Sequence, residues 1–66
     1  MKKWKYHRGK GWSKWIMGSS WVTKYDEDEF CHYGINGVYR PGCRIKKPAE
    51  ARAEVELAIN NTIEVV

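Results

Sequence analysis

The sequence predicts an α+β fold, in which a small antiparallel sheet of three to five strands carries one C-terminal helix packed on one face. Three observations support this prediction. All nine aromatic residues precede residue 40, short apolar runs alternate with glycine-containing turns, and a segment rich in Ala and Glu follows Pro48. Because a chain of 66 residues can bury only one small core, residues 1–66 are expected to form a single binding domain.

The first 25 residues are expected to form three short strands, at 4–8, 12–17 and 21–25. Glycine-containing turns at residues 9–11 and 18–20 separate them, since glycine adopts a positive φ at little steric cost. In the third strand, Trp21, Thr23 and Tyr25 occupy alternate positions, so we expect them to share one face of the sheet.

Residues 30–40 are the clearest predicted hairpin. Asn36-Gly37 lies between β-branched residues, which is the preferred signal for a two-residue type I′ turn. With that turn as the loop, Tyr33 pairs with Arg40. Cys31 then falls opposite Gly42, and a one-residue bulge after Arg40 would bring Cys43 beside Cys31.

The C-terminal helix is predicted over about residues 48–61. Pro48 suits its first turn, where a missing N–H costs nothing, and Glu50 suits the positive end of the helix dipole. Leu57 lies off the apolar stripe. Asn60-Asn61 is expected to end the helix, and residues 62–66 then alternate like a short final edge strand. The stripe expected to pack on the sheet consists of Ala51, Val55, Ala58, Ile59 and Thr62.

Charge is distributed unevenly along the chain, although the net charge is only +4. Residues 1–25 carry seven cations and no acid, and residues 40–47 are basic again. Between them, the acidic run 26–29 is expected to be a solvated turn, and the C-terminal segment is mostly acidic.

The basic and aromatic N-terminal segment, residues 1–14, indicates a nucleic-acid-binding surface. Lys and Arg neutralise phosphates, while Trp and Tyr rings stack on unpaired bases. We expect the cations of 1–14 and of 40–47 to gather on one side of the sheet with flat rings between them. The candidate binding residues are Lys2, Lys3, Trp4, Lys5, Tyr6, Arg8, Lys10, Trp12, Lys14, Arg40, Arg44, Lys46 and Lys47.

A protein partner is the alternative for the same surface. Tryptophan is enriched at the centres of protein interfaces, and four tryptophans are many for so small a domain. Trp4, Trp12, Trp15 and Leu57 would then act as anchors on a host protein complex, and the acidic run could meet a basic patch on it.

No catalytic residue, cofactor or metal site is expected. Cys31 and His32 are neighbours on a predicted strand, so their side chains point to opposite faces and cannot form a nucleophile–base pair. A zinc-stabilised adaptor using Cys31, Cys43 and a histidine remains an alternative, but the sequence lacks the usual C-x2-C and H-x3-H spacings. A Cys31–Cys43 disulfide is a further alternative to two reduced thiols.

The order of elements resembles the sheet-plus-helix DNA-binding modules of phage integrase arms and AP2-type domains, which lay a three-stranded sheet in the major groove. The resemblance is one of architecture and carries no motif residue across. In its small size the chain also resembles phage-encoded accessory proteins, including inhibitors of host nucleases and CRISPR complexes, which implies a host protein as the alternative partner.

No stretch of the sequence reaches the roughly 20 apolar residues that a membrane-spanning helix needs, so no membrane is expected among the partners. The expected location is the cytoplasm, or the host cytoplasm for a phage-encoded protein. The sequence does not select between a monomer and a homodimer.

Overall fold

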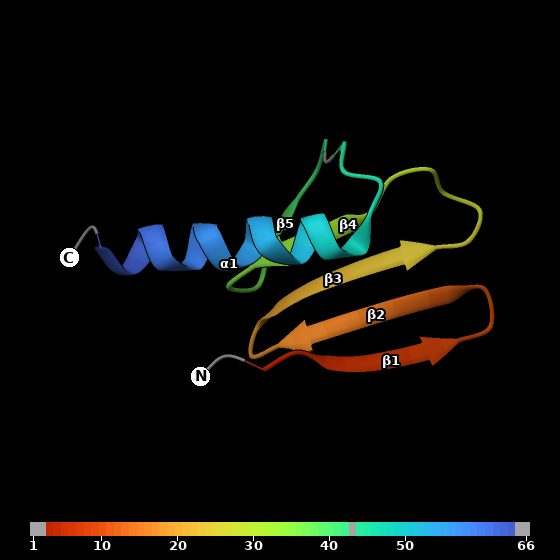
Figure 1. The fold of residues 1–66 in the computed structure, drawn as a ribbon, viewed down its shortest axis with the longest axis horizontal. Coiled ribbons are helices and arrows are strands. Elements are labelled where there is room, and N and C mark those ends of the chain that lie inside the picture. Colours follow the sequence, from red (N-terminus) through yellow and green to blue (C-terminus); the bar gives the residue numbers. More distant parts are fainter. Residues whose placement is uncertain (1–2, 43, 65–66) are drawn as a thin grey trace.

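The computed structural model describes residues 3–42 and 44–64, which form one five-stranded antiparallel sheet and one helix (Figure 1). The strands follow one another in the sheet in chain order, β1-β2-β3-β4-β5, so that each pairs with its neighbour in sequence. This confirms the predicted α+β class. The elements are β1 (Lys5–Gly9), β2 (Trp12–Met17), β3 (Ser20–Tyr25), β4 (His32–Ile35), β5 (Val38–Arg40) and α1 (Pro48–Glu64).

The turn between β4 and β5 has the predicted conformation. Asn36 and Gly37 have φ values of 52° and 84°, as a type I′ turn requires at both central positions. Tyr33 pairs with Arg40 across this hairpin, so the predicted register is confirmed. The predicted position of Cys43 beside Cys31 lies outside the described residues.

The acidic run leaves β3 as an exposed loop that is fastened at both ends. The Lys24 ammonium donates to the backbone carbonyls of Tyr25 and Asp28. At the far end, the backbone N–H of Cys31 donates to the carbonyl of Ile45 at 2.8 Å. This last bond ties the loop to the segment that leads into α1.

The core lies between α1 and one face of β3 and β4. Its buried apolar members are Val22, Cys31, Ile35, Ala51 and Val55. Partly buried residues pack around them: Trp4, Trp15, Tyr33, Ile45, Ala58 and Ile59. The predicted helix stripe is therefore confirmed for Ala51, Val55, Ala58 and Ile59, whereas the side chain of Thr62 lies outside the described residues. Leu57 is 54% exposed, as its position off the stripe predicts.

The prediction that residues 62–66 form a final strand is wrong where the structure describes them. α1 continues through Asn60 and Asn61 and ends at Glu64, while residues 65–66 lie outside the described range. Asparagine costs a helix interior only about 0.7 kcal/mol relative to alanine. Each further residue of an existing helix also adds a backbone hydrogen bond. Two asparagines are therefore a weak stop signal once a helix is docked on a sheet.

Candidate functional site

The pairing register divides the strand residues between two faces of the sheet. Trp15, Val22 and Tyr33 lie side by side on β2, β3 and β4, and all three pack in or against the core beneath α1. Residues one position away along each strand point to the opposite side, which we call the open face. The side chains on the open face are Lys5, His7, Trp12, Lys14, Ile16, Trp21, Thr23, Tyr25, His32 and Tyr39.

Two indoles on the open face lie over strand glycines. A Cβ atom added to Gly9 would come within 2.2 Å of the Trp12 ring, and one added to Gly34 within 2.4 Å of the Trp21 ring. Each ring therefore covers a neighbouring strand at a position where only glycine leaves room for it. Both indoles are half-buried.

Further rings extend this surface across β4 and β5. The rings of Trp21 and Tyr39 are nearly parallel, with an interplanar angle of 4° and centroids 5.9 Å apart. His32 lies next to Tyr39, with centroids 6.2 Å apart, and meets Tyr25 at a steeper angle of 70°. Tyr25 and Tyr39 are 45% and 49% exposed, so much of their aromatic surface is accessible.

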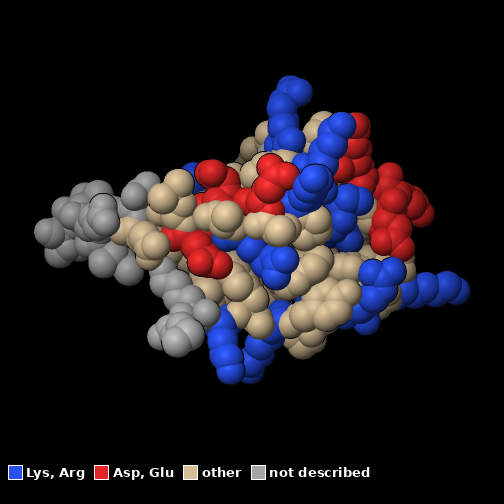
Figure 2. Space-filling view, viewed as in Figure 1, with Lys and Arg blue, Asp and Glu red and all other residues tan. Residues whose placement is uncertain are grey.

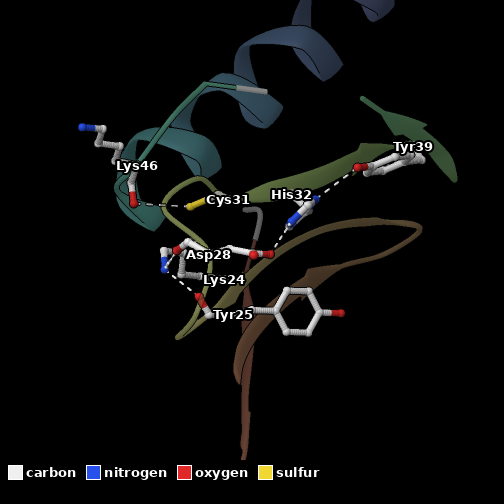
Figure 3. A network of polar contacts seen from close by, with 7 residues as sticks. All are labelled: Lys24, Tyr25, Asp28, Cys31, His32, Tyr39 and Lys46. Atoms are coloured by element: carbon white, nitrogen blue, oxygen red, sulfur yellow. Dashed lines mark hydrogen bonds and ion pairs between the residues drawn. The ribbon is translucent and has the colours of Figure 1, made fainter. Parts of the chain in front are cut away.

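Two hydrogen-bonding partners fix the orientation of the His32 ring, as Figure 3 shows. Its Nε2 lies 2.9 Å from a carboxylate oxygen of Asp28, and its Nδ1 lies 3.1 Å from the hydroxyl of Tyr39. These contacts join the acidic loop, β4 and β5 at one point. The imidazole is consequently held as part of the aromatic surface and does not turn freely.

Two adjacent hollows lie on the open face. The larger, the Trp21 hollow, has a volume of about 370 Å³ and is lined by Lys14, Trp21, Thr23, Tyr25, His32 and Tyr39. The smaller, the Trp12 hollow, has a volume of about 200 Å³ and is lined by Trp12, Lys14, Thr23 and Tyr25. Both hollows thus share Lys14, Thr23 and Tyr25.

The strand residues of the open face include lysines and no carboxylate. Lys14 is central, and its ammonium lies 5.8 Å from the centroid of the Trp21 ring, within the range of a cation–π contact. Lys5 lies on β1. Acidic groups approach from the loop. Glu27 and Asp28 help to line a further hollow together with Lys10, and Asp28, whose carboxylate contacts His32, lines another with Tyr39.

The opposite face of the molecule has mixed charge. In the view of Figure 2, which looks onto α1, Lys and Arg side chains alternate with Asp and Glu over the helix and at the end that carries the acidic loop. Two ionic contacts join the acidic loop to cations of the protein itself: Arg8 lies 3.7 Å from Asp26, and Lys46 lies 2.8 Å from Glu29. These cations are partly neutralised by the protein itself.

The prediction that the cations of 1–14 and of 40–47 gather on one side of the sheet is wrong, because the register places Lys5 and Lys14 on the open face but Arg8 and Arg40 on the α1 side. Lys5, Trp12 and Lys14 lie on the open face, with Lys10 in the turn between their strands. Lys3 is exposed just before β1, and Lys2 lies outside the described residues. The register turns Tyr6, Arg8 and Arg40 toward the α1 side, and the segment before α1 carries Arg44, Lys46 and Lys47.

Trp4 and Tyr6 have structural partners on the α1 side. The indole N–H of Trp4 donates to a carboxylate oxygen of Glu56 at 2.7 Å, which fastens the N-terminal segment to the helix. Tyr6 packs on Trp15, with ring centroids 5.1 Å apart. Hydrogen bonds with Ser13 and Arg8 lower the pKa of the Tyr6 hydroxyl below that of an ordinary tyrosine.

Sequence reasoning missed the aromatic residues that lie farther along the sheet. The candidate residues did not include Trp21, Tyr25, His32 and Tyr39, because they were chosen for the alternation of cations with aromatic rings in residues 1–14. The alternation of Trp21, Thr23 and Tyr25 was the available signal. Combined with the Tyr33–Arg40 pairing, which places Tyr39 opposite Gly34, it could have led to the same face.

The described residues offer neither a metal site nor a membrane-spanning helix. Over residues 3–42 and 44–64, no group of three or more His, Cys, Asp and Glu side chains is placed to hold a metal ion. In the same part of the chain, α1 is neither long nor apolar enough to span a bilayer.

Comparison with known proteins gives no family assignment. No protein-family model, no curated protein and no solved structure matches this chain.

Proposed function

We propose that this protein binds nucleic acid without catalysing a reaction, and that the open face of the sheet is its binding surface. The observation that carries the proposal is the composition of that face. Two indoles, two phenol rings and two imidazoles surround Lys14, and no strand residue among them is acidic.

Each component of the face has a counterpart in a nucleic acid. Every base has a flat aromatic surface, which stacks on Trp, Tyr or His rings whatever the base sequence. Ammonium groups neutralise phosphates and release condensed counterions. Thr23 and the Tyr39 hydroxyl add hydrogen-bonding groups beside the rings.

Charge favours nucleic acid over the alternative of a host protein complex. The α1 side mixes both signs and uses Arg8 and Lys46 in internal ion pairs, whereas the cations of the open face have no acidic strand neighbour. The strands of the open face contribute lysines and rings but no carboxylate, and the Asp28 carboxylate that borders the face is bonded to His32. Such a surface suits a polyanion that carries flat bases. A protein partner would also anchor on the indoles, so the binding experiment must be able to reveal it.

The proposal predicts direct binding of labelled oligonucleotides, measured by fluorescence anisotropy at low salt with DNA and RNA in single-stranded and duplex form. Lys14→Gln removes the central cation of the open face and should weaken binding several-fold, because one phosphate contact is lost. Arg40→Gln is the matched control, since it removes the same charge from the α1 side and should change the affinity by less than about twofold.

Absence of binding to every one of these oligonucleotides would overturn the proposed function. Equal losses for the two variants would also contradict it, because they would show that overall charge and not the open face controls binding. A protein captured from a nuclease-treated bacterial lysate, and released by Lys14→Gln while oligonucleotides fail to bind, would assign the face to the host-protein alternative.

A further inference from the structure

The open face carries a more specific inference about the form of the nucleic acid, which rests on the proposed function. Its two indoles are widely separated along the strands. Trp12 and Ile16 are four residues apart on β2, and Ile16 pairs with Trp21 on β3. At about 3.3 Å per residue, the rows that contain Trp12 and Trp21 are about 13 Å apart.

The indoles are also separated across the sheet. The Trp12 ring covers Gly9 on β1, whereas the Trp21 ring covers Gly34 on β4. Three strand spacings of about 4.8 Å make this separation about 14 Å. The line between the two rings therefore crosses the open face diagonally. Lys14 on β2 and Thr23 on β3, which pair with each other in the row midway between those of Trp12 and Trp21, lie along it.

This separation fits bases that are not stacked on one another. Successive bases in a duplex strand rise by only about 3.4 Å, and their flat surfaces are covered by their neighbours. A duplex can therefore not offer base surfaces to two rings this far apart without being opened. An unpaired strand can, because its bases splay outward and stack on protein side chains.

The small number of cations on the open face also favours a single strand over a duplex. Within β1, β2 and the turn that joins them, the cations on or beside the open face are Lys5, Lys10 and Lys14, whereas duplex-binding proteins commonly engage six or more phosphates. The rings therefore outnumber the cations on this face. A surface of this composition draws much of its affinity from stacking, which only unpaired bases provide.

We propose that the open face binds a short single-stranded segment that crosses the sheet diagonally. One base stacks at the Trp12 hollow beside Tyr25, and a later base stacks at the Trp21 hollow beside Tyr39 and His32. The connecting backbone passes Lys14, whose ammonium is shared by both hollows and neutralises a phosphate there. The identity of the bases should have little effect on the affinity, because every base can stack on an aromatic ring.

The test compares a labelled single-stranded oligonucleotide of about ten nucleotides, a common site size for such surfaces, with the duplex of the same sequence at equal salt. The wild-type protein should bind the single strand at least about tenfold more tightly, and binding should quench its tryptophan fluorescence. Tyr25→Ala removes a wall shared by both hollows and should reduce single-strand affinity about tenfold or more.

Tyr6→Ala is the matched control. Tyr6 is also an exposed tyrosine on the same sheet, 54% accessible against 45% for Tyr25, but it lies on the α1 side. Its variant should change single-strand affinity by less than about twofold. Thermal unfolding of both variants establishes that each remains folded at the temperature of the binding measurement.

Duplex binding as tight as single-strand binding would overturn this inference and leave the proposed function intact. Equal losses for Tyr25→Ala and Tyr6→Ala would overturn both the inference and the assignment of binding to the open face, because Tyr6 lies on the other side of the sheet. Failure to bind either form is a different result, because it overturns the proposed function itself.

Discussion

Ser20 connects two turns of the sheet through one buried hydroxyl. It is 1% exposed at the start of β3, and its Oγ accepts a hydrogen bond from the backbone N–H of Asn36 at 3.0 Å. Next to it, the N–H of Gly37 donates to the carbonyl of Ser19 at 2.9 Å. These two bonds hold the β4–β5 turn against the β2–β3 turn, and they thereby fix the hairpin that carries Tyr39.

Ser20→Ala should therefore lower the free energy of unfolding by about 0.5–1.5 kcal/mol, because the hydrogen bond between the buried Ser20 hydroxyl and the Asn36 N–H is lost. Urea unfolding followed by tryptophan fluorescence measures the change. Ser19→Ala is the control, because Ser19 is exposed and accepts its hydrogen bond through the backbone carbonyl, which the substitution keeps. The free energy of unfolding of this variant should be within about 0.5 kcal/mol of that of the wild type. Equal losses would show that the Ser20 hydroxyl is not the important group.

At the scale of the elements, the sheet is built so that indoles lie over glycines in adjoining strands. The Trp21 ring lies over Gly34 in the buried middle of the sheet, and the Trp12 ring lies over Gly9 on the edge strand β1. A glycine in a strand interior normally weakens it, since it has no side chain to pack. Here the ring of the neighbouring strand covers the bare backbone and supplies that packing.

Gly34→Ala should displace the Trp21 ring, because the new methyl group would lie 2.4 Å from it. Overpacking of this kind costs about 1–3 kcal/mol. Urea unfolding should show this decrease in the free energy of unfolding, and the tryptophan fluorescence of the folded state should change because the Trp21 ring is displaced.

Gly9→Ala provides the comparison. The Trp12 ring lies at the edge of the sheet and can swing outward, so the same substitution should cost less there than at Gly34. A larger cost at Gly9 than at Gly34 would contradict this account of the two ring positions.

At the scale of the whole molecule, α1 gives the two faces of the sheet different roles. It covers the face that carries Trp15, while Trp4 is fastened to the helix through Glu56, so two of the four tryptophans serve the core. The other two, Trp12 and Trp21, remain on the open face. In the acidic loop, Asp26 pairs with Arg8 and Glu29 with Lys46. Asp28 bonds to His32 at one side of the open face, and Lys14 is the central cation of that face.

The salt dependence of binding should reflect this small set of cations. If Lys5, Lys10 and Lys14 each neutralise one phosphate of a single strand, the plot of log K against log salt should have a slope of about −2. Titrations of one oligonucleotide at several salt concentrations measure it. A slope near −5 is what about six phosphate contacts on a duplex would give, and it would show that cations beyond the open face take part.

Local patterns predicted most of the secondary structure. Asn36-Gly37 specified its turn, because both residues tolerate a positive φ. The alternation in residues 21–25 specified a strand. The spacing of Ala51, Val55 and Ile59 specified which side of the helix packs on the sheet. The end of α1 was mispredicted because the asparagine signal is weaker than the gain from continuing a docked helix.

The candidate site was predicted less completely. Lys5, Trp12 and Lys14 were identified because they are close in sequence, whereas Tyr6 and Arg8, equally close, turn to the other side. Trp21, His32 and Tyr39 join the face only through the pairing of four successive strands.

The sequence by itself determined the strands, their turns and the helix, because these depend on interactions between residues a few positions apart. Only the tertiary structure decided which side of the sheet α1 covers, and so which rings are buried and which stay accessible. That choice depends on the sum of contacts between α1 and residues far from it in the chain, such as Val22 and Cys31, and no local pattern records it.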